Sequence, residues 1–507
     1  MTNVSLLSSS SASLERLKEI CAAESARRGK IRVVLINTPL DFYEVGSCPR
    51  YDTLFPFGLA LLAEIAKGQG ISCVLIDGEA LRLSVTEISE FVLALRPDLV
   101  GINLLSPTIP VAAKICKQIE GAARFVVGGG PHVTFEPGDT IRRIPQLTHL
   151  FRGEAIDAWT KFLPSVFMNP SPYPIRGVSL PGQPLGTLGE RTMDLDSLPE
   201  IQRRDLAFPF YQQVSGRRET SILASLGCAE QCRYCAGRSF WGGILRFRTP
   251  ERVVDEIERC VQTEGIDAFH FADDNLLQDA RYLRSFRREL ERRNIRVVWR
   301  AFARVDHVSG GVLEDAVASG CYRLTFGIES GSDRVLQKMN KGHGTEDALK
   351  AIHACKRAGI ETKAFFMLGY PGETRDDMES TVSFAMDSGL DWAYFYLVRA
   401  FPGTALFADL LRRGYAREEL LEYVHWVPAM DTGLSEVERA CRSLLQSSGG
   451  FSVDSVLKYN VAHRRSISEY STNEELVEVL ASAYRRFYYR PAFVETLKAR
   501  LKPVELG

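Results

Sequence analysis

The first part of the chain alternates short apolar runs with longer amphipathic segments. Short apolar runs are typical of buried strands, and amphipathic segments are typical of helices. Strands are predicted at 31–37, 73–76, 99–103 and 125–127, and helices at 56–68, 84–95 and 109–119. This alternation predicts an α/β fold with a doubly wound, Rossmann-like parallel sheet, whose ligand crevice lies at the carboxyl ends of the strands.

A second alternation begins after a stretch rich in Pro and Gly at about 164–210, where periodicity fades and a linker is predicted. Strands are predicted at 220–226, 268–271, 297–300, 323–326, 362–367 and 392–397, with helices at 252–263, 280–293, 311–319, 345–358 and 375–387. Six strand and helix repeats are too few for a closed eight-stranded barrel. We therefore expect an open, partial barrel with its active site at the carboxyl ends of the strands.

The predicted organisation has five parts. They are an N-terminal arm (1–30), a doubly wound domain (31–165), a linker (166–215), a partial barrel (216–405) and a helical C-terminal domain (406–507). The start, Met1 to Ser13, is rich in Ser and lacks both a basic beginning and a long apolar core, so a disordered arm is expected rather than a secretory signal. No apolar run approaches the roughly 18 residues that cross a bilayer, so we expect a cytoplasmic protein without membrane association.

Charge and cysteine content narrow the chemistry. Lys and Arg number 62 against 63 for Asp and Glu, so the net charge is close to zero. No overall positive electrostatic field would therefore attract nucleic acid or an anionic membrane. A small-molecule substrate recognised locally is expected instead. The 11 cysteines, without a secretory signal, indicate a reducing compartment, where clustered thiols usually bind metal and scattered thiols pack in cores.

One cysteine group follows the first strand of the predicted barrel. Cys228, Cys232 and Cys235 lie in a single short loop. Thiolates are the usual protein ligands of iron-sulfur clusters, and a loop this short can place all three around one cluster. A fourth protein ligand is missing, which leaves one iron open to a ligand with an amino and a carboxylate group. A zinc site completed by a distant residue, or a coincidence of core cysteines, stays open as an alternative at this stage.

This loop resembles the signature of the radical S-adenosylmethionine superfamily, Cys-x3-Cys-x2-Cys with an aromatic residue before the last cysteine, a position filled here by Tyr234. The resemblance continues at or just beyond the ends of predicted strands, in the segments 271–275, 304–306, 327–331 and 366–373. Carboxylates suit the cationic parts of S-adenosylmethionine, and a guanidinium suits its carboxylate. The resemblance implies a four-iron, four-sulfur (4Fe-4S) cluster on the three cysteines.

The resemblance also implies roles for single residues around S-adenosylmethionine. Asp274 and Asn275 would approach its amino group, Glu329 and Ser330 its ribose, and Gly369 its adenine. Arg304 is the candidate for its carboxylate. Any one of the acidic or hydroxyl residues could instead cap the following helix.

The N-terminal unit is similar to that of the cobalamin-dependent branch of the superfamily. The similarity rests on its position ahead of the barrel, the loop 128–132, the linker segment 195–199 and the segment 484–491 near the end. It implies that cobalamin lies over the strand ends, where consecutive glycines permit close approach. The candidate cobalamin contacts on the strand-end loops are Ser106, Thr108, Gly128, Gly129, Gly130, His132, Gly153 and Glu154. A generic nucleotide site or an empty domain is the alternative.

The sequence departs from many cobalamin proteins in one respect. It has no Asp-x-His-x-x-Gly motif, whose histidine coordinates cobalt, and neither His132 nor His149 fits that motif. Tyr43, Glu44 and Arg50 follow the first strand, but nothing local distinguishes them from solvated loop residues, and no role is assigned to them. The lower axial ligand of cobalt is left open.

The resemblance implies methyl transfer to an unactivated carbon, or less often phosphorus, of a small biosynthetic molecule. One S-adenosylmethionine methylates cobalamin, and a second is cleaved at the cluster to give the radical that abstracts hydrogen from the substrate. It also implies an electron donor such as flavodoxin or ferredoxin. Because the cofactors carry this chemistry, no general acid and base pair need be visible in the sequence.

Three other functions share parts of this pattern. A cobalamin-dependent cyclase or ring-rearranging enzyme would have the same motifs and a different substrate pocket. A methylthiotransferase needs a second cluster in the N-terminal domain, but Cys21, Cys48, Cys73 and Cys116 are scattered. A cobalamin-binding sensor needs no radical-generating cluster. Candidate substrate contacts, which could equally be core residues, are Trp392, Tyr394, Tyr396, Arg399, Tyr423 and Trp426.

Overall fold

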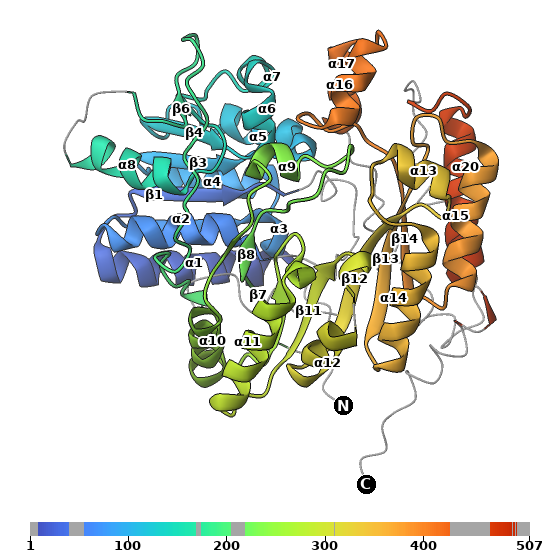
Figure 1. Cartoon of the computed structure of the whole chain (residues 1–507). Coiled ribbons are helices and arrows are strands. Elements are labelled where there is room, and N and C mark those ends of the chain that lie inside the picture. Colours follow the sequence, from blue (N-terminus) through green and yellow to red (C-terminus); the bar gives the residue numbers. More distant parts are fainter. Residues whose placement is uncertain are drawn as a thin grey trace.

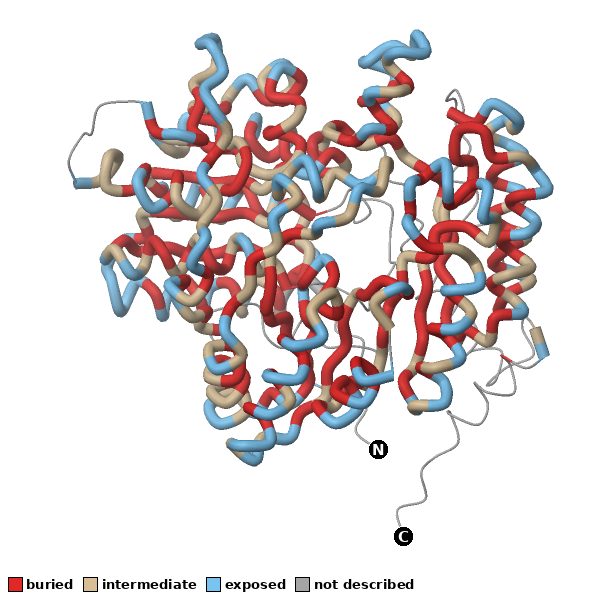
Figure 2. Tube along the Cα trace, viewed as in Figure 1, coloured by how far each residue is buried: buried red, intermediate tan, exposed pale blue. Residues whose placement is uncertain are grey.

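The computed structural model describes residues 9–39, 55–168, 174–203, 218–308, 310–425, 467–488, 490, 491 and 493. Two parallel sheets, one in each half of the chain, organise these residues into two domains (Figure 1). The strands of both sheets are buried, and exposed residues lie mostly on the surrounding helices and loops (Figure 2). In the described residues, no helix is both long enough and apolar enough to cross a bilayer.

The N-terminal sheet has the order β2-β1-β3-β4-β5-β6. Its strands are β1 (Val33–Asn37), β2 (Cys73–Asp77), β3 (Leu99–Asn103), β4 (Phe125–Gly129), β5 (His149–Phe151) and β6 (Val178–Ser179). All of the pairs are parallel except β5 with β6. The order reverses between β1 and β3, which is the switch point at which doubly wound sheets bind ligands. The predicted doubly wound sheet is therefore confirmed.

Helices cover both faces of this sheet, as its buried strands require. They are α2 (Phe57–Gly68), α3 (Gly78–Leu81), α4 (Val85–Leu95), α5 (Ile109–Gln118), α6 (Pro131–Phe135), α7 (Pro137–Arg143) and α8 (Ile156–Phe167). Ser106–Thr108 form a 3-10 turn directly after β3. The short helices α6 and α7 follow β4, so they stand at the carboxyl ends of the strands.

The expectation of an N-terminal arm is wrong for the described part of that segment. Residues Ser9–Arg28 form the helix α1. Leu17, Ile20 and Cys21 are buried in the core of the N-terminal domain, and the Glu24 carboxylate accepts a hydrogen bond from the backbone N–H of Cys73 in β2 (3.2 Å). The Ser-rich beginning conceals this helix in the sequence, because its large apolar side chains are few.

The second sheet has the order β14-β13-β12-β11-β10-β7, and its pairs are all parallel. The strands are β7 (Glu219–Ile222), β10 (Ala268–Phe271), β11 (Val298–Ala303), β12 (Cys321–Glu329), β13 (Glu361–Leu368) and β14 (Trp392–Leu397). The intervening helices are α10 (Pro250–Arg259), α11 (Ala280–Arg292), α12 (Gly310–Ala318), α13 (Asp333–Lys338), α14 (Thr345–Arg357) and α15 (Arg375–Asp387). The six predicted repeats of an open barrel are confirmed.

The first predicted strand of the barrel is divided in two. After β7 ends, β8 (Ser225–Leu226) leaves the sheet and pairs antiparallel with β9 (Arg246–Phe247). The cysteine loop and the short helix α9 (Gly237–Trp241) lie between these two strands. The two-stranded antiparallel pair of β8 and β9, called the ribbon below, fixes both ends of the cysteine loop.

The open edge of the barrel at β14 is covered by α20 (Asn473–Tyr488) (Figure 1). The Tyr484 hydroxyl accepts from the backbone N–H of Phe395 (3.2 Å) and donates to its carbonyl (3.0 Å). The Tyr488 hydroxyl does the same with Ala393 (3.3 and 2.7 Å). Tyrosine hydroxyls thus satisfy backbone groups that an edge strand leaves unpaired.

The described part of the predicted linker packs against both domains. Leu195, Leu198 and Ile201 are buried with the N-terminal core. Glu154 forms an ion pair with Arg246 of β9 (2.8 Å), and its other oxygen accepts from the backbone N–H of Thr192 (2.8 Å). The carboxylate thereby joins the N-terminal domain, the linker and the ribbon. The helices α16 (Ala405–Arg412) and α17 (Arg417–His425) follow β14.

Candidate functional site

The cysteine loop begins with a turn that only glycine permits. Gly227 has a φ of 99°, and a Cβ at this position would lie 2.1 Å from the Ile244 carbonyl oxygen. In the loop that follows, Cys228 and Cys232 are partly exposed and Cys235 is exposed. The three thiols therefore remain open to a ligand.

Backbone hydrogen bonds from distant parts of the barrel domain fix the loop. The N–H of Arg233 donates to the Met339 carbonyl (2.9 Å), and the N–H of Leu406 donates to the Arg233 carbonyl (2.8 Å). The Asn340 side chain donates to the Gln231 carbonyl (2.9 Å). The cysteine backbone is thus held by the protein's own contacts.

Arg304 places a positive charge beside this loop. Its Nη1 lies 3.6 Å from the Cys232 sulfur, while Nε and Nη2 donate to Asp306 (2.9 and 2.7 Å). Burial alone would lower the pKa of Arg304, but the Asp306 carboxylate raises it above its usual value. The guanidinium can therefore donate a hydrogen bond to the Cys232 sulfur. A contact with the carboxylate of S-adenosylmethionine stays a prediction, because Asp306 already engages two of its donors.

Tyr234, Glu329 and Lys341 form a hydrogen-bonded group behind the loop. The Tyr234 hydroxyl donates to Glu329 Oε1 (2.9 Å), and Lys341 Nζ donates to the Tyr234 hydroxyl (2.9 Å) and to Glu329 Oε1 (3.3 Å). Glu329 ends β12 with a φ of 75°, a conformation rare for residues other than glycine. Burial and the Glu329 carboxylate raise the pKa of Tyr234 well above its usual value, so this hydroxyl stays a donor.

The acidic residues after β10 differ in role. Asp273 is buried and accepts from the Ser225 hydroxyl (2.5 Å) and the backbone N–H of Ala224 (3.1 Å), and burial raises its pKa to about 7. Asp274 is exposed and accepts hydrogen bonds from Trp241 and from the backbone of Gly227. Asp273 therefore supports the ribbon, whereas Asp274 lies at the cysteine loop.

Asn275 has a buried polar atom without a described partner. Its Nδ2 hydrogen bonds with His307 Nδ1 (2.9 Å), while Oδ1 has no hydrogen bond among the described residues. An unpaired buried acceptor is unfavourable, so a donor from a ligand would stabilise it. This atom suits the expected amino group of S-adenosylmethionine.

The loop after β13 is ordered by a buried carboxylate. Glu373 Oε2 accepts from the backbone N–H groups of Gly369 (2.5 Å) and Tyr370 (3.0 Å), and burial raises its pKa to about 8. Gly369 has a φ of 84°, and a Cβ there would lie 3.0 Å from the Leu476 side chain. The turn therefore requires glycine on geometric grounds, and its contact with adenine stays a prediction.

Ser330 supports the same region from within the core. Its side chain is fully buried, and its hydroxyl hydrogen bonds with that of Thr381 (3.1 Å) and accepts from the backbone N–H of Ser332 (3.1 Å). These contacts account for the hydroxyl, and a direct contact with the ribose stays a prediction.

A cavity of about 370 Å³ lies between the two domains. The N-terminal domain contributes Trp159 of α8 and several strand-end residues to its wall, among them Asn103, Gly129, Gly130, Gly153 and Glu154. The barrel domain contributes Leu223, Leu226, Phe240, Trp241 and Ala272. Leu226 and Trp241 flank the cysteine loop, so one cavity adjoins both predicted cofactor sites.

The cavity's walls fit an apolar ring such as the base at the end of the nucleotide tail of cobalamin. A Cβ at Gly130, whose φ is 121°, would lie 2.7 Å from the Leu104 carbonyl oxygen, and this tight turn brings backbone to the cavity surface. Gly129 also lines the cavity, but a Cβ there would meet only Phe151, at 3.4 Å. The glycines and the apolar wall together are typical of a small-molecule pocket.

Four other predicted cobalamin contacts lie away from the wall of this cavity. Gly128 packs toward Leu104 in the core. Thr108 Oγ1 accepts from the backbone N–H of Leu105 (3.1 Å), and the Ser106 hydroxyl hydrogen bonds with His132 (2.9 Å). His132 is fully buried. Their contact with cobalamin stays a prediction.

The sequence reasoning missed Phe240, Trp241, Asn103 and Lys341. The first two line the cavity and directly follow the cysteine loop, where paired aromatic residues in a glycine-rich segment were the available signal. Asn103 ends β3 at the switch point of the sheet. Lys341 had no local signal, because only the fold brings it to Tyr234.

We expect Tyr234→Phe to weaken the binding of S-adenosylmethionine by about fivefold, since Glu329 loses one donor worth about 1 kcal/mol. The measurement is calorimetric titration of the iron-loaded protein under anaerobic conditions. Iron content should not change. Tyr322→Phe, which removes a hydroxyl bonded to Glu219 deeper in the barrel, is the matched control and should bind normally. Wild-type affinity in Tyr234→Phe would contradict a role for Glu329 in binding.

Family models match both domains. A model of the Radical SAM superfamily matches residues 222–385, and a model of the B12 binding domain matches residues 47–163. The chain is 27% identical over 448 residues to uncharacterized methyltransferase PH0819 from Pyrococcus horikoshii, covering 86% of this chain and 88% of that protein. It is 27% identical over 370 residues to anaerobic magnesium-protoporphyrin IX monomethyl ester cyclase from Rubrivivax gelatinosus, covering 70% and 66%.

A solved structure supports the fold of most of the chain. The radical S-adenosylmethionine methyltransferase TsrM from Kitasatospora setae, with cobalamin and an iron-sulfur cluster bound, matches with a TM-score of 0.63 and 20% identity, over 76% of this chain and 78% of that chain. The two domains occur in the predicted order, and the cysteine loop and the glycine-lined cavity lie where they meet. The chain therefore belongs to the cobalamin-dependent radical S-adenosylmethionine enzymes.

Proposed function

We propose that this enzyme transfers a methyl group from S-adenosylmethionine to an unactivated carbon, or less often phosphorus, of a small biosynthetic molecule. The observation that carries the proposal is the shared cavity. Gly129 and Gly130 of the cobalamin domain face the same space as Leu226 and Trp241, which flank the cysteine loop. A reaction that uses both cofactors on one substrate requires this proximity.

The cofactors supply the chemistry when bound: cleavage of S-adenosylmethionine at the cluster, and transfer of the methyl group through cobalamin. The protein's residues bind and orient. Cys228, Cys232 and Cys235 would hold the cluster, and Arg304 would donate to the Cys232 sulfur. Tyr234 and Lys341 position the Glu329 carboxylate, which could accept from hydroxyl groups of the ligand.

The interior face of the barrel offers a surface for the substrate. The rings of Phe302 and Phe365 lie 6.1 Å apart, and Phe365 lies 5.5 Å from Tyr394 and 5.8 Å from Tyr396. Lys363 Nζ donates to the Tyr394 hydroxyl (2.7 Å) and lies 3.9 Å from that ring's centre. An aromatic wall with one cation suits an unsaturated substrate that carries an anionic group.

Two of the sequence candidates for substrate contact have other contacts. Trp392 is buried, packs against Phe493 (5.5 Å between ring centres) and donates from Nε1 to Glu361 Oε1 (2.5 Å). The Tyr423 hydroxyl donates to the Val398 carbonyl (3.3 Å). Trp426 lies outside the described residues.

A cyclase or ring-rearranging enzyme is the second candidate, and the similarity to a cyclase from Rubrivivax gelatinosus favours it. A methylthiotransferase would need three further thiols together. In the described N-terminal domain, Cys21, Cys73 and Cys116 are each buried, and burial raises the pKa of each thiol. Cys48 lies outside the described residues. Thiols in these environments are poor metal ligands.

The deciding experiment uses S-adenosylmethionine with a trideuterated methyl group. The enzyme, loaded anaerobically with cluster and cobalamin and supplied with reduced flavodoxin or ferredoxin, is incubated with a small-molecule extract of cells that lack it. We expect a product that carries the deuterated methyl group. Protein with Cys232→Ala is the control and should give no product.

An unlabelled product with a new ring would favour the cyclase instead. Absorption of the anaerobically purified enzyme tests the remaining alternative. Corrin bands together with iron-sulfur absorption are expected, whereas corrin bands alone would indicate a cobalamin-binding sensor.

A further inference from the structure

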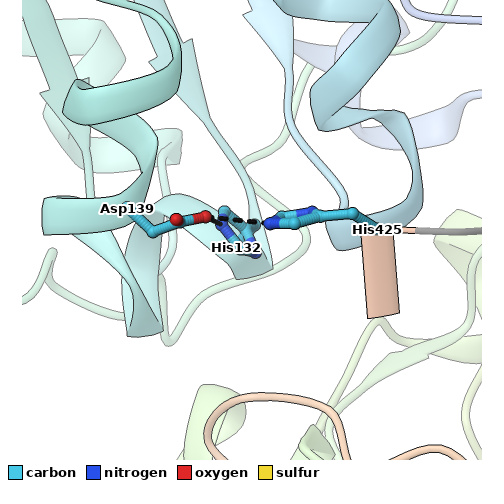
Figure 3. Close-up of side chains that lie close together, drawn as sticks. All are labelled: His132, Asp139 and His425. Atoms are coloured by element: carbon cyan, nitrogen blue, oxygen red, sulfur yellow. Dashed lines mark hydrogen bonds and ion pairs between the residues drawn. The ribbon is translucent and has the colours of Figure 1, made fainter. Parts of the chain in front are cut away.

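His132, Asp139 and His425 converge in the interior of the protein (Figure 3). Their side chains are 0%, 2% and 3% exposed. Asp139 Oδ2 lies 3.1 Å from His132 Nε2 and 2.9 Å from His425 Nε2, and one ligand atom from each residue lies within 4.8 Å of the other two. His132 is in α6 and Asp139 in α7 of the N-terminal domain, whereas His425 ends α17.

Ser106 contacts the Nδ1 atoms of both histidine rings, which are the nitrogens that point away from Asp139. His132 Nδ1 hydrogen bonds with the Ser106 hydroxyl (2.9 Å), and His425 Nδ1 lies 2.8 Å from the Ser106 carbonyl oxygen. A carbonyl only accepts, so Nδ1 of His425 carries the proton. In a neutral ring, Nε2 then has a lone pair that faces the Asp139 carboxylate at 2.9 Å. Only a cation between these atoms, or a second proton, makes this contact favourable.

The hydrogen bonds of the two histidines are of the kind that metal-binding histidines make. Such a histidine binds the metal through one nitrogen and hydrogen bonds through the other to a carbonyl or another polar group. Zinc binds nitrogen and oxygen at about 2.0–2.2 Å, which separates tetrahedral ligand atoms by about 3.3–3.6 Å. The present separations of 2.9 and 3.1 Å need to widen by only a few tenths of an ångström.

Some of the charged residues around the site weaken its attraction for a cation, and one strengthens it. Arg142 and Arg143 donate to Asp139, and Arg143 also pairs with Glu422. The arginines weaken attraction for a cation, and Glu422 offsets one of them.

We propose that His132, Asp139 and His425 bind a zinc ion that fastens α17 to the cobalamin-binding domain. The site is buried, so its role is structural. His132 follows the loop 128–130, and Ser106 lies in the turn after β3, so the ion would fix two strand-end loops and α17 together. The inference is independent of which reaction the enzyme performs.

The test measures zinc in full-length protein whose cluster cysteines are all replaced (Cys228→Ala, Cys232→Ala, Cys235→Ala), because free thiolates also bind zinc. After equilibration with zinc sulfate and removal of excess on a chelating resin, plasma mass spectrometry should find about one zinc per chain. Adding His425→Asn, whose amide can still donate to the Ser106 carbonyl, should remove it. Adding His149→Asn, a substitution at another buried histidine of the same domain, should not.

A second measurement needs no substitution near the site. X-ray absorption at the zinc edge of wild-type protein with its iron-sulfur cluster assembled should show a shell of nitrogen and oxygen without sulfur. No zinc in the protein with its three loop cysteines replaced, or only sulfur-bound zinc in the wild type, would overturn the proposal. His425 and Asp139 would then form a hydrogen-bonded pair of an imidazolium and a carboxylate without a metal ion.

Discussion

Replacing Cys228, Cys232 or Cys235 by Ala is expected to abolish both cluster assembly and the cleavage of S-adenosylmethionine. Each substitution removes one of three protein ligands, and no other described cysteine lies in this loop to replace it. Iron should fall from about four per chain toward zero. Cleavage should fall by more than about 100-fold, the upper limit for losing a group that only supports a ligand.

The controls for this prediction are cysteines in the barrel core. Cys260, Cys321 and Cys355 are buried, and burial raises the pKa of each thiol, so Ala at any of them should leave iron content and cleavage near wild type. Cys441 lies outside the described residues. Iron is measured by colorimetric assay after anaerobic reconstitution, and cleavage by chromatography of the nucleoside product. A full iron complement with normal cleavage in any loop variant would show that the cluster is bound elsewhere.

Gly129→Leu should remove most of the bound cobalamin and leave the iron of the cluster unchanged. Gly129 lines the cavity between the domains, and its φ lies outside the left-handed region. A Cβ there meets Phe151 at 3.4 Å, so the backbone can accept a side chain while the rest of the leucine fills the cavity. Gly130 is a poorer choice, because a Cβ there would lie 2.7 Å from the Leu104 carbonyl oxygen and strain the fold.

The matched control is Gly68→Leu, at the exposed end of α2 in the same domain, where a Cβ meets nothing within 4 Å. Corrin absorbance after desalting should drop in Gly129→Leu and persist in Gly68→Leu. Cleavage of S-adenosylmethionine should survive at least partly in both, while product formation should fail only in the first. Wild-type corrin occupancy in Gly129→Leu would refute the placement of cobalamin in this cavity.

Local patterns in the sequence were sufficient for the architecture and for the metal-binding loop. Each strand and helix is set mainly by the spacing of its own apolar residues, so both parallel sheets could be predicted. The strands β5 (His149–Phe151) and β6 (Val178–Ser179) were missed, because two or three residues are too few to show a periodic pattern. The cysteine loop is equally local, since Cys228, Cys232 and Cys235 share one turn of chain that Gly227 initiates. The helix α1 escaped prediction because the side chains that it buries are sparse, and their partners lie in β2.

Tertiary structure alone decided which groups meet around these features. Lys341 reaches Tyr234 and Glu329 only because β12 and the cysteine loop end at the same edge of the barrel. The strand-end glycines and Trp241 line one cavity because the linker and the Glu154–Arg246 ion pair join the domains there. His425 meets His132 from the far end of the barrel sequence. Such contacts depend on the packing of whole elements, and the spacing of residues along the chain contains no measure of that packing.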